Sequence, residues 1–172
     1  MTTNQLQEAL IREIEDISRD ISFVNYKQEP AALKGYLQAI PIFPVFENQP
    51  LGTDYDMLSE EMTENRLFPY FVVRVDGAEY CKPKEDMGEV NQAHVMIAFA
   101  IYDDNPELKG YFTLTAIMER VIMRFQRNPV LGSFFCSRTM KTAYQEDDAF
   151  PQFFGGIEML WYLPDISVEG FT

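Results

Sequence analysis

Residues 93–102 constrain the fold most, because they alternate like a strand and are apolar on both sides. One face would carry Ala93, Val95, Ile97, Phe99 and Ile101, and the other His94, Met96, Ala98, Ala100 and Tyr102. A strand with two apolar faces lies inside a sheet, with a neighbour on each edge. The longest apolar run, residues 95–102, is far shorter than the ~20 residues of a membrane-spanning helix. The sequence therefore predicts an interior strand and no membrane segment.

Three other segments are predicted as strands. Residues 68–75 alternate and are followed by Asp76-Gly77, a turn signal, so the charged residues 78–91 should form a projecting loop. Residues 134–144 alternate less well, because Arg138 interrupts the apolar face. Residues 157–163 alternate up to Pro164, and Gly155-Gly156 before them indicate a bulge or a close backbone approach.

Two amphipathic helices are predicted, over residues 4–21 and 106–127. In the first, Asn4 is a plausible cap, and one stripe carries Leu6, Leu10, Ile14, Ile17 and Ile21. The second starts at Asp104-Asn105-Pro106 and stops at Asn128-Pro129. Its inward positions are expected to be Leu108, Tyr111, Leu114 or Thr115, Met118, Val121 or Ile122, and Phe125. Pro30 could open a shorter helix that runs to Leu37.

The order of these elements is helix, extended segment, strand, strand, helix, strand, strand. Sequential antiparallel hairpins on either side of a helix predict an α+β fold, with a mostly antiparallel sheet and two main helices packed on one face. A chain of 172 residues is long enough for one domain with a real core, so residues 1–172 are assigned to a single domain. The lone Trp161 should be buried between Ile157, Met159 and the second helix.

Composition excludes several kinds of function. The net charge is −13, with 14 basic against 27 acidic residues, which argues against a protein built to hold nucleic acid. No signal peptide is recognisable at the start, so a cytoplasmic setting is expected, in which Cys81 and Cys136 remain free thiols. A zinc site needs about four ligands, and His94 is the only histidine.

No catalytic constellation emerges from the sequence. The acidic pairs Glu60-Glu61, Asp103-Asp104 and Asp147-Asp148 could hold a hard cation, but loop solubility, helix capping and turn chemistry explain them as well. His94 lies in a predicted strand without an adjacent nucleophile and is expected to be packed. The two glycines at 155–156 precede a strand rather than a phosphate-binding helix. We therefore expect no enzyme, no cofactor and no metal.

Two long polar segments, residues 47–66 and 78–90, are candidates for contacts with other subunits. Connections this long tend to be functional, and loops on rigid scaffolds carry recognition. The second segment carries both signs of charge, which suits pairing between subunits; a solvated, mobile hairpin is the alternative. Its candidate interface residues are Glu79, Tyr80, Lys82, Lys84, Glu85 and Asp86.

Residues 40–164 resemble phage tail-terminator (tail-completion) proteins. The resemblance is carried by structural motifs: Phe68-Pro69-Tyr70-Phe71-Val72-Val73-Arg74, Tyr102-Asp103, Gly110-Tyr111, Asn128-Pro129 with Leu131-Gly132, and Pro151-Gln152-Phe153-Phe154-Gly155-Gly156-Ile157 ending in Trp161 and Pro164. It implies a subunit of a ring, expected to be a hexamer, that caps the head-proximal end of the tail tube, halts its polymerisation and offers a docking face to the head.

The partners implied by the resemblance are other copies of the chain, the tail-tube protein and a head-completion or neck protein. The protein would assemble in the host cytoplasm and reside in the virion tail. DNA would pass through the ring without specific binding, so the channel should be acidic, from residues 47–66 or from the 145–150 loop with Asp147 and Asp148. Two alternatives remain open: another neck or head–tail connector (stopper) protein, and an acidic binding module.

Overall fold

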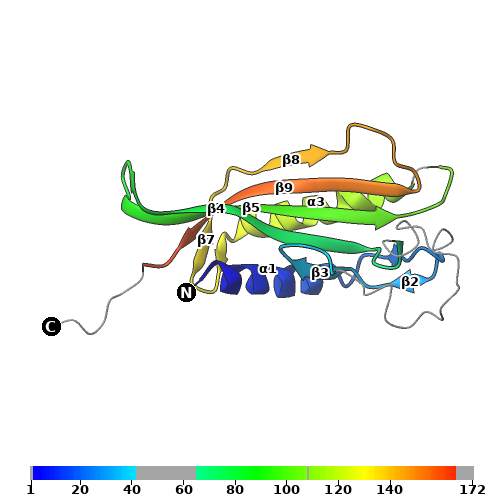
Figure 1. The fold of residues 1–172 in the computed structure, drawn as a ribbon, viewed down its shortest axis with the longest axis horizontal. Helices are drawn as coiled ribbons and strands as arrows, with labels where there is room; N and C mark the ends of the chain where they lie inside the picture. Colours follow the sequence, from blue (N-terminus) through cyan, green and yellow to red (C-terminus); the bar gives the residue numbers. More distant parts are fainter. Residues whose placement is uncertain (1, 42–64, 108, 166–172) are drawn as a thin grey trace, which may run out of the picture.

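The computed structural model describes residues 2–41, 65–107 and 109–165 (Figure 1). Two long helices and one large sheet make up a single α+β domain. The helices are α1 (Thr3–Ile17) and α3 (Lys109–Arg127). The strands are β1 (Phe23–Val24), β2 (Pro30–Ala31), β3 (Lys34–Leu37), β4 (Tyr70–Lys84), β5 (Gly88–Tyr102), β6 (Val130–Leu131), β7 (Phe134–Cys136), β8 (Lys141–Tyr144) and β9 (Gln152–Leu163).

The main sheet has the order β3-β4-β5-β9-β7-β6, and β8 also pairs with β9, next to β7. All its pairs are antiparallel except β3 with β4. The central strand β5 pairs with β4 on one edge and with β9 on the other, where the register runs from Asn91↔Leu163 to Tyr102↔Gln152. The prediction of an interior strand at residues 93–102 is confirmed.

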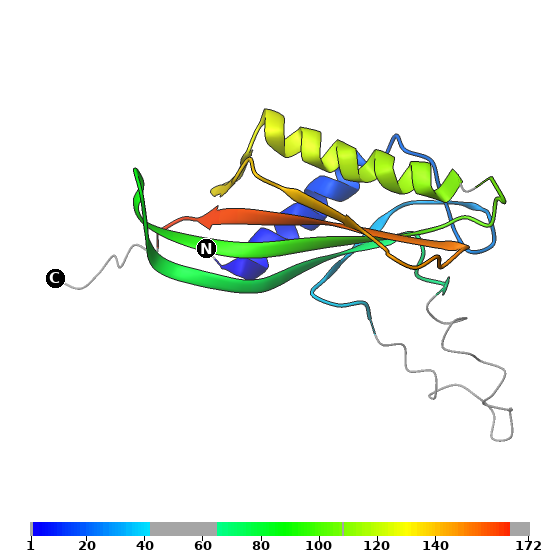
Figure 2. The same cartoon turned by 90° about the horizontal axis from the view of Figure 1, so that it is seen from above.

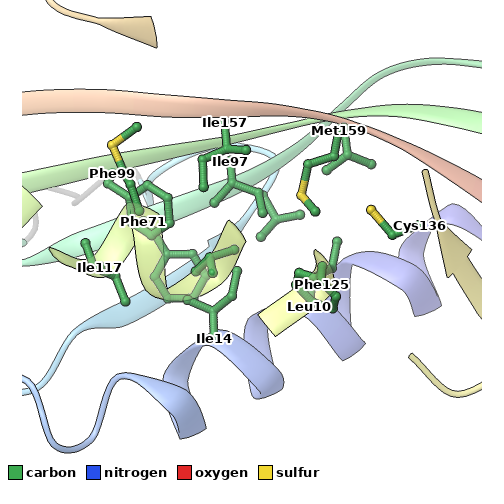
Figure 3. Close-up of a cluster of buried hydrophobic side chains, with 14 of the residues drawn as sticks. Leu10, Ile14, Phe71, Ile97, Phe99, Ile117, Phe125, Cys136, Ile157 and Met159 are labelled. Atoms are coloured by element: carbon green, nitrogen blue, oxygen red, sulfur yellow. The ribbon is translucent and has the colours of Figure 1, made fainter. Parts of the chain in front are cut away.

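Both helices pack on the same face of the sheet, as predicted (Figure 2). The strands supply alternate residues to this face, and Phe71, Ile97, Phe99, Ile157 and Met159 meet side chains of both helices (Figure 3). Burying such side chains contributes roughly 1.5–3 kcal/mol each relative to leaving them exposed. On the opposite face, which we call the open face, no helix of the described residues covers the sheet. It carries Val72, Arg74, Met96, Ala98, Phe154, Glu158 and Leu160.

Trp161 is fully buried, and its prediction is confirmed. Its ring meets the ring of Phe125 edge to face, with centroids 5.1 Å apart and an interplanar angle of 85°. Trp161 comes from β9 and Phe125 from α3, so this pair joins the sheet to the helix. The edge-to-face geometry is the one that aromatic quadrupoles favour.

Helix α1 starts and ends earlier than predicted. The cap is Thr2 instead of Asn4: its Oγ1 accepts a hydrogen bond from the N–H of Gln5, and the Gln5 side chain accepts one from the N–H of Thr2. This reciprocal capping box satisfies two N–H groups that the helix leaves unpaired. The helix stops at Ile17, and Ile21 packs against the core from the turn that follows.

Helix α3 stops before Asn128-Pro129 as predicted, but one inward position is wrong. Tyr111 is half-exposed, whereas Ile117, which the prediction omits, is fully buried. The buried stripe runs through Leu114, Ile117, Met118, Val121 and Phe125. Tyr111 continues the same spacing, but it lies in the first turn, where its ring contacts Tyr144 of β8 and stays half-exposed. Leu108 lies outside the described residues.

The predicted helix from Pro30 to Leu37 is wrong, because this segment forms β2 and β3. Gly35 explains why β3 can lie here: a Cβ at Gly35 would collide with the ring of Phe71 and fall 2.8 Å from Cγ2 of Ile11. The chain passes so close to the core that only glycine fits. Parallel pairing with β4 then replaces local helical bonding.

The predicted turn at Asp76-Gly77 is also wrong. The register shifts between Val75 and Gly77, so Asp76 occupies a β-bulge and β4 continues to Lys84. Residues 78–91 were predicted as a loop, but most of them extend β4 and β5 into a two-stranded ribbon with a turn at Glu85–Met87. We call residues 76–92 the arm; its ends are still paired within the sheet, and its part between Glu79 and Asn91 projects beyond the last β5–β9 pair, Asn91↔Leu163, as predicted (Figure 1).

The segment 134–144 is two strands rather than one. Strand β7 ends at Cys136 and β8 begins at Lys141, and Arg138, which interrupts the apolar pattern, lies between them. Both strands pair with β9, β7 with its end and β8 with its start. Gly155 and Gly156 pair regularly within β9, so they mark no bulge, but Gly155 does mark a close approach: a Cβ there would lie 2.7 Å from Sδ of Met118.

Cys81 and Cys136 are free thiols in opposite surroundings. Cys81 is exposed on the arm, whereas Cys136 is buried, and burial raises the pKa of its thiol to about 12. Because the thiolate is the reactive form, we expect a chromogenic thiol reagent to modify only Cys81 in the native protein, and Cys136 only after unfolding. A Cys81→Ser variant should then show no fast thiol. Two fast thiols in the native wild type would contradict the burial of Cys136.

Candidate functional site

The structure brings the six predicted interface residues together on the arm. Glu79, Tyr80, Lys82 and Lys84 belong to the β4 half of the ribbon, and Glu85 and Asp86 to its turn. Asp86 and Gly88 have positive φ angles of 67° and 72°, which close the turn. The arm is therefore an ordered ribbon that presents charges of both signs, and not an irregular loop.

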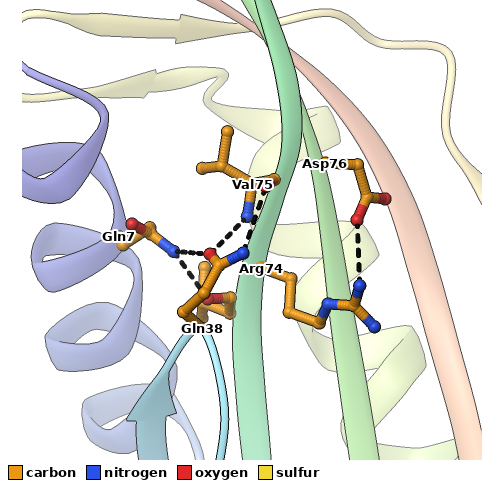
Figure 4. Close-up of polar contacts among 6 residues, drawn as sticks. Gln7, Gln38, Arg74, Val75 and Asp76 are labelled. Atoms are coloured by element: carbon orange, nitrogen blue, oxygen red, sulfur yellow. Dashed lines mark hydrogen bonds and ion pairs between the residues drawn. The ribbon is translucent and has the colours of Figure 1, made fainter.

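Two glutamine side chains form hydrogen bonds at the base of the arm, next to the β-bulge at Asp76 (Figure 4). The side chain of Gln38 accepts a hydrogen bond from the N–H of Val75 at 3.1 Å and donates one to its carbonyl at 3.3 Å. The buried Gln7 of α1 donates to Gln38 Oε1 and to the carbonyl of Val73, both at 2.8 Å. This network ties helix, edge strand and bulge together, so the direction of the arm is fixed by the domain.

A second polar cluster lies on the arm around Glu79. The carboxylate accepts hydrogen bonds from Gln92 and from His94, both at 3.1 Å, and pairs with Lys82 at 2.9 Å. His94 is half-exposed in this cluster, so the prediction that it is packed is wrong. The hydrogen bonds of Lys82, His94 and Gln92 lower the pKa of Glu79 to about 2.

Acidification is expected to loosen the arm before the core. The pKa of Glu79 is lower in the fold than its ordinary 4.5, so its contacts favour the ordered arm above pH 4.5 and are lost as the pH falls towards about 2. Amide hydrogen exchange of residues 78–92 should rise over this window while that of α3 stays protected. The Glu79→Gln variant should lose this pH dependence. Equal acid sensitivity in the variant would show that other carboxylates cause it.

The arm also exposes apolar side chains. Tyr80 and Met87 are more than half exposed on or near its tip, and Lys84 places its Nζ 4.2 Å from the centroid of the Tyr162 ring on the sheet. The Tyr162 ring in turn lies 6.2 Å from that of Phe135. The Lys84 side chain is thus held against the sheet at Tyr162. Tyr80 and Met87 instead point to solvent, as apolar groups at a protein contact surface do.

Asp147 and Asp148 lie in the exposed loop between β8 and β9, far along the sheet from the arm (Figure 1). Asp148 Oδ1 accepts a hydrogen bond from the N–H of Phe150 at 2.9 Å, and the carbonyl of Asp147 accepts one from the Gln145 side chain at 3.0 Å. Residues 47–64 of the other predicted contact segment lie outside the described residues, as does the acidic pair Glu60-Glu61.

The chain matches no protein-family model, and no match is found among curated proteins. Within residues 2–41, 65–107 and 109–165, no group of three or more His, Cys, Asp or Glu side chains is arranged to hold a metal ion. No helix in that part of the chain is long and apolar enough to cross a bilayer.

One surface was missed from the sequence. Tyr111 and Phe112 of α3, Tyr144 of β8 and Phe150 of the following loop are all exposed and lie near one another at the start of α3. Tyr111 was expected to point inward, and the other three rings come from separate elements. Only the fold brings these four rings together, so no local sequence pattern predicts this surface.

Proposed function

We propose that this protein is a phage tail terminator, a ring-forming structural subunit that caps the head-proximal end of the tail tube. The observation that carries the proposal is the arm: an ordered, charged ribbon that extends from a compact α+β domain and is fixed at its base by Gln7 and Gln38. Residues 79–92 contribute no side chain to the helix-covered core. The arm suits contact with a neighbouring subunit or the tail tube, through Glu79, Tyr80, Lys82, Lys84, Glu85 and Asp86.

The charge of the chain supports the same function. A ring around the channel must let the genome pass, and a basic lining would hold DNA through many phosphate contacts. A net charge of −13 per subunit repels the duplex at short range. The protein would assemble in the host cytoplasm and reside in the virion tail, between tail tube and neck protein.

Native mass spectrometry combined with negative-stain microscopy tests the ring directly. We expect a closed ring with one defined number of subunits, six by the resemblance, formed by the purified protein or on tail tubes. A protein that stays a single subunit under both conditions would contradict the proposal, and would favour the acidic binding module that the net charge also suits. A ring that seats on the head portal instead of the tail tube would indicate a connector.

Electrophoresis with double-stranded DNA tests the account of the channel. At physiological salt we expect no retardation of the duplex, because 27 acidic residues outnumber 14 basic ones. A short duplex mixed with a basic DNA-binding protein serves as the positive control. Retardation that disappears as salt is raised would overturn the proposal that DNA passes without binding.

A further inference from the structure

Four exposed aromatic rings, of Tyr111, Phe112, Tyr144 and Phe150, gather at the start of α3, and we call this surface the aromatic end. Phe112 is 69% exposed, and its ring centroid lies 6.2 Å from that of Tyr111, which in turn lies 5.8 Å from that of Tyr144. Phe150 is half-exposed and meets Phe153 at 6.3 Å, beside Gly110 of the same helix turn. Clustered exposed apolar side chains are typical of contact surfaces, and aromatic rings are enriched at the centre of protein interfaces.

Carboxylates surround the aromatic end. Residues 103–107 and the 145–150 loop meet there, since the N–H of Asp103 donates to the carbonyl of Pro151 at 2.9 Å. The one cation of these two segments and the start of α3 is Lys109, which already pairs with Glu107 at 3.2 Å. The patch thus has an apolar centre and an acidic rim made of Asp103, Asp104, Glu107, Glu146, Asp147 and Asp148.

The opposite end of α3 carries the complementary features, and we call it the basic end. Residues 120–141 contain five Lys or Arg and no carboxylate, in a chain of net charge −13. Arg120 and Arg124 are used within the subunit, by Asp20 and Glu13 of the α1 region. Arg127 and Arg138 pair with no carboxylate of the described residues. Beside them, Val130 and Phe135 are exposed on β6 and β7.

The two ends cannot meet within one molecule. Helix α3 has 19 residues, which corresponds to roughly 28 Å at 1.5 Å per residue. Figures 1 and 2 both place the start of α3 with the 145–150 loop at one end of the sheet, and β7 with the arm at the other. Two different surfaces that complement each other from opposite ends define a head-to-tail contact, which closes into a ring when the rotation per subunit allows.

We propose that the aromatic end of one subunit docks on the basic end of the next copy of this chain, with Phe112 and Tyr144 against Val130 and Phe135, and the acidic rim against Arg127 and Arg138. This inference rests on the proposed ring and assigns its contact surfaces. Opposite charges at the rim select the partner and its orientation, while the rings supply apolar burial. Asp147 and Asp148 then lie at the subunit contact, and not on the channel wall where the sequence alone places them.

Two variants, each disabled at one end, test the contact. The first carries Phe112→Ser, Asp147→Asn and Asp148→Asn, and the second Arg127→Glu and Arg138→Glu, so the two altered ends do not attract each other in a mixture. All five side chains are exposed, so circular dichroism and the melting temperature should stay as in the wild type. A matched control carries Leu37→Ser, Glu8→Gln and Glu29→Gln, an apolar-to-serine change and two carboxylate-to-amide changes at exposed sites away from both ends.

Native mass spectrometry should find the wild type and the control as rings and each variant alone as a single subunit. An equimolar mixture of the two variants keeps one intact pair of ends, so it should give a dimer of one copy of each and nothing larger. Rings in both variants would overturn this inference and leave the proposed function standing. Variants that fail to pair in the mixture, or that form rings but lose binding to tail tubes, would also overturn it. A wild type that never assembles would overturn both.

Discussion

Replacing Trp161 with alanine should lower the free energy of unfolding by about 3–5 kcal/mol, as truncations of buried tryptophan do. Trp161 is fully buried in β9, and its ring packs on Phe125 of α3. Its removal leaves a cavity between the sheet and the helix, in a core whose other large side chains are fixed in position. Denaturation by urea, followed by far-ultraviolet circular dichroism, measures the change.

The Trp161→Phe variant is the matched control. It keeps an aromatic ring against Phe125 and removes the indole N–H, which has no hydrogen-bond partner among the described residues although it is buried. The Trp161→Phe variant should therefore lose clearly less free energy of unfolding than the alanine variant. Because Trp161 is the single tryptophan, its fluorescence also reports on the native site. An emission maximum typical of water, or equal stability of the alanine variant and the wild type, would contradict the account of the core.

Shortening the arm should abolish assembly and leave the domain folded. Residues 79–92 can be replaced by Asn-Gly, because Ala78 and Ala93 are paired across the ribbon and a two-residue turn joins such a pair. The variant lacks the Glu79 cluster and the exposed Tyr80 and Met87. It also loses the buried Val90, Asn91 and Gln92, but keeps the strands β4 up to Ala78 and β5 from Ala93, which carry the helix-covered core. Native mass spectrometry should find single subunits in place of rings, and binding to tail tubes should be lost.

Two observations distinguish a loss of assembly from damage to the fold in the shortened protein. The shortened protein should unfold cooperatively in urea, because the arm contributes little to the helix-covered core. A Glu89→Gln variant, which keeps the arm at full length and leaves its six candidate interface residues unchanged, should still assemble at neutral pH. Rings of unchanged size from the shortened protein would show that the arm is a solvated hairpin with no part in subunit contact.

The elements whose patterns are local were predictable. The stripe from Leu6 to Ile14, the double-sided alternation of residues 93–102 and the stop at Asn128-Pro129 predicted both long helices and the central strand. Together they were enough for the fold class, because a two-sided apolar strand and two one-sided helices have few ways to share a core.

The elements that depend on distant partners were not predictable. Strand β3 exists because Gly35 lets the chain pass against Phe71, and Pro30 suggested a helix instead. Asp76-Gly77 has the composition of a turn but lies in a bulge held by Gln38, a residue far away in the chain. The candidate interface residues of the arm lie together on one ribbon because they are neighbours in the sequence, and their role stays a prediction. The aromatic end instead required rings from three separate segments to meet in space.

The central claim is that this chain ends a tail tube, and stopping tube growth in solution tests it most directly. The tail-tube protein that the proposed function requires as a partner is allowed to polymerise with and without the purified chain, and tube lengths are measured by electron microscopy. The account predicts shorter tubes with a ring at one end only, and no effect from the variant with the shortened arm. Tubes of unchanged length without added density at either end would contradict it.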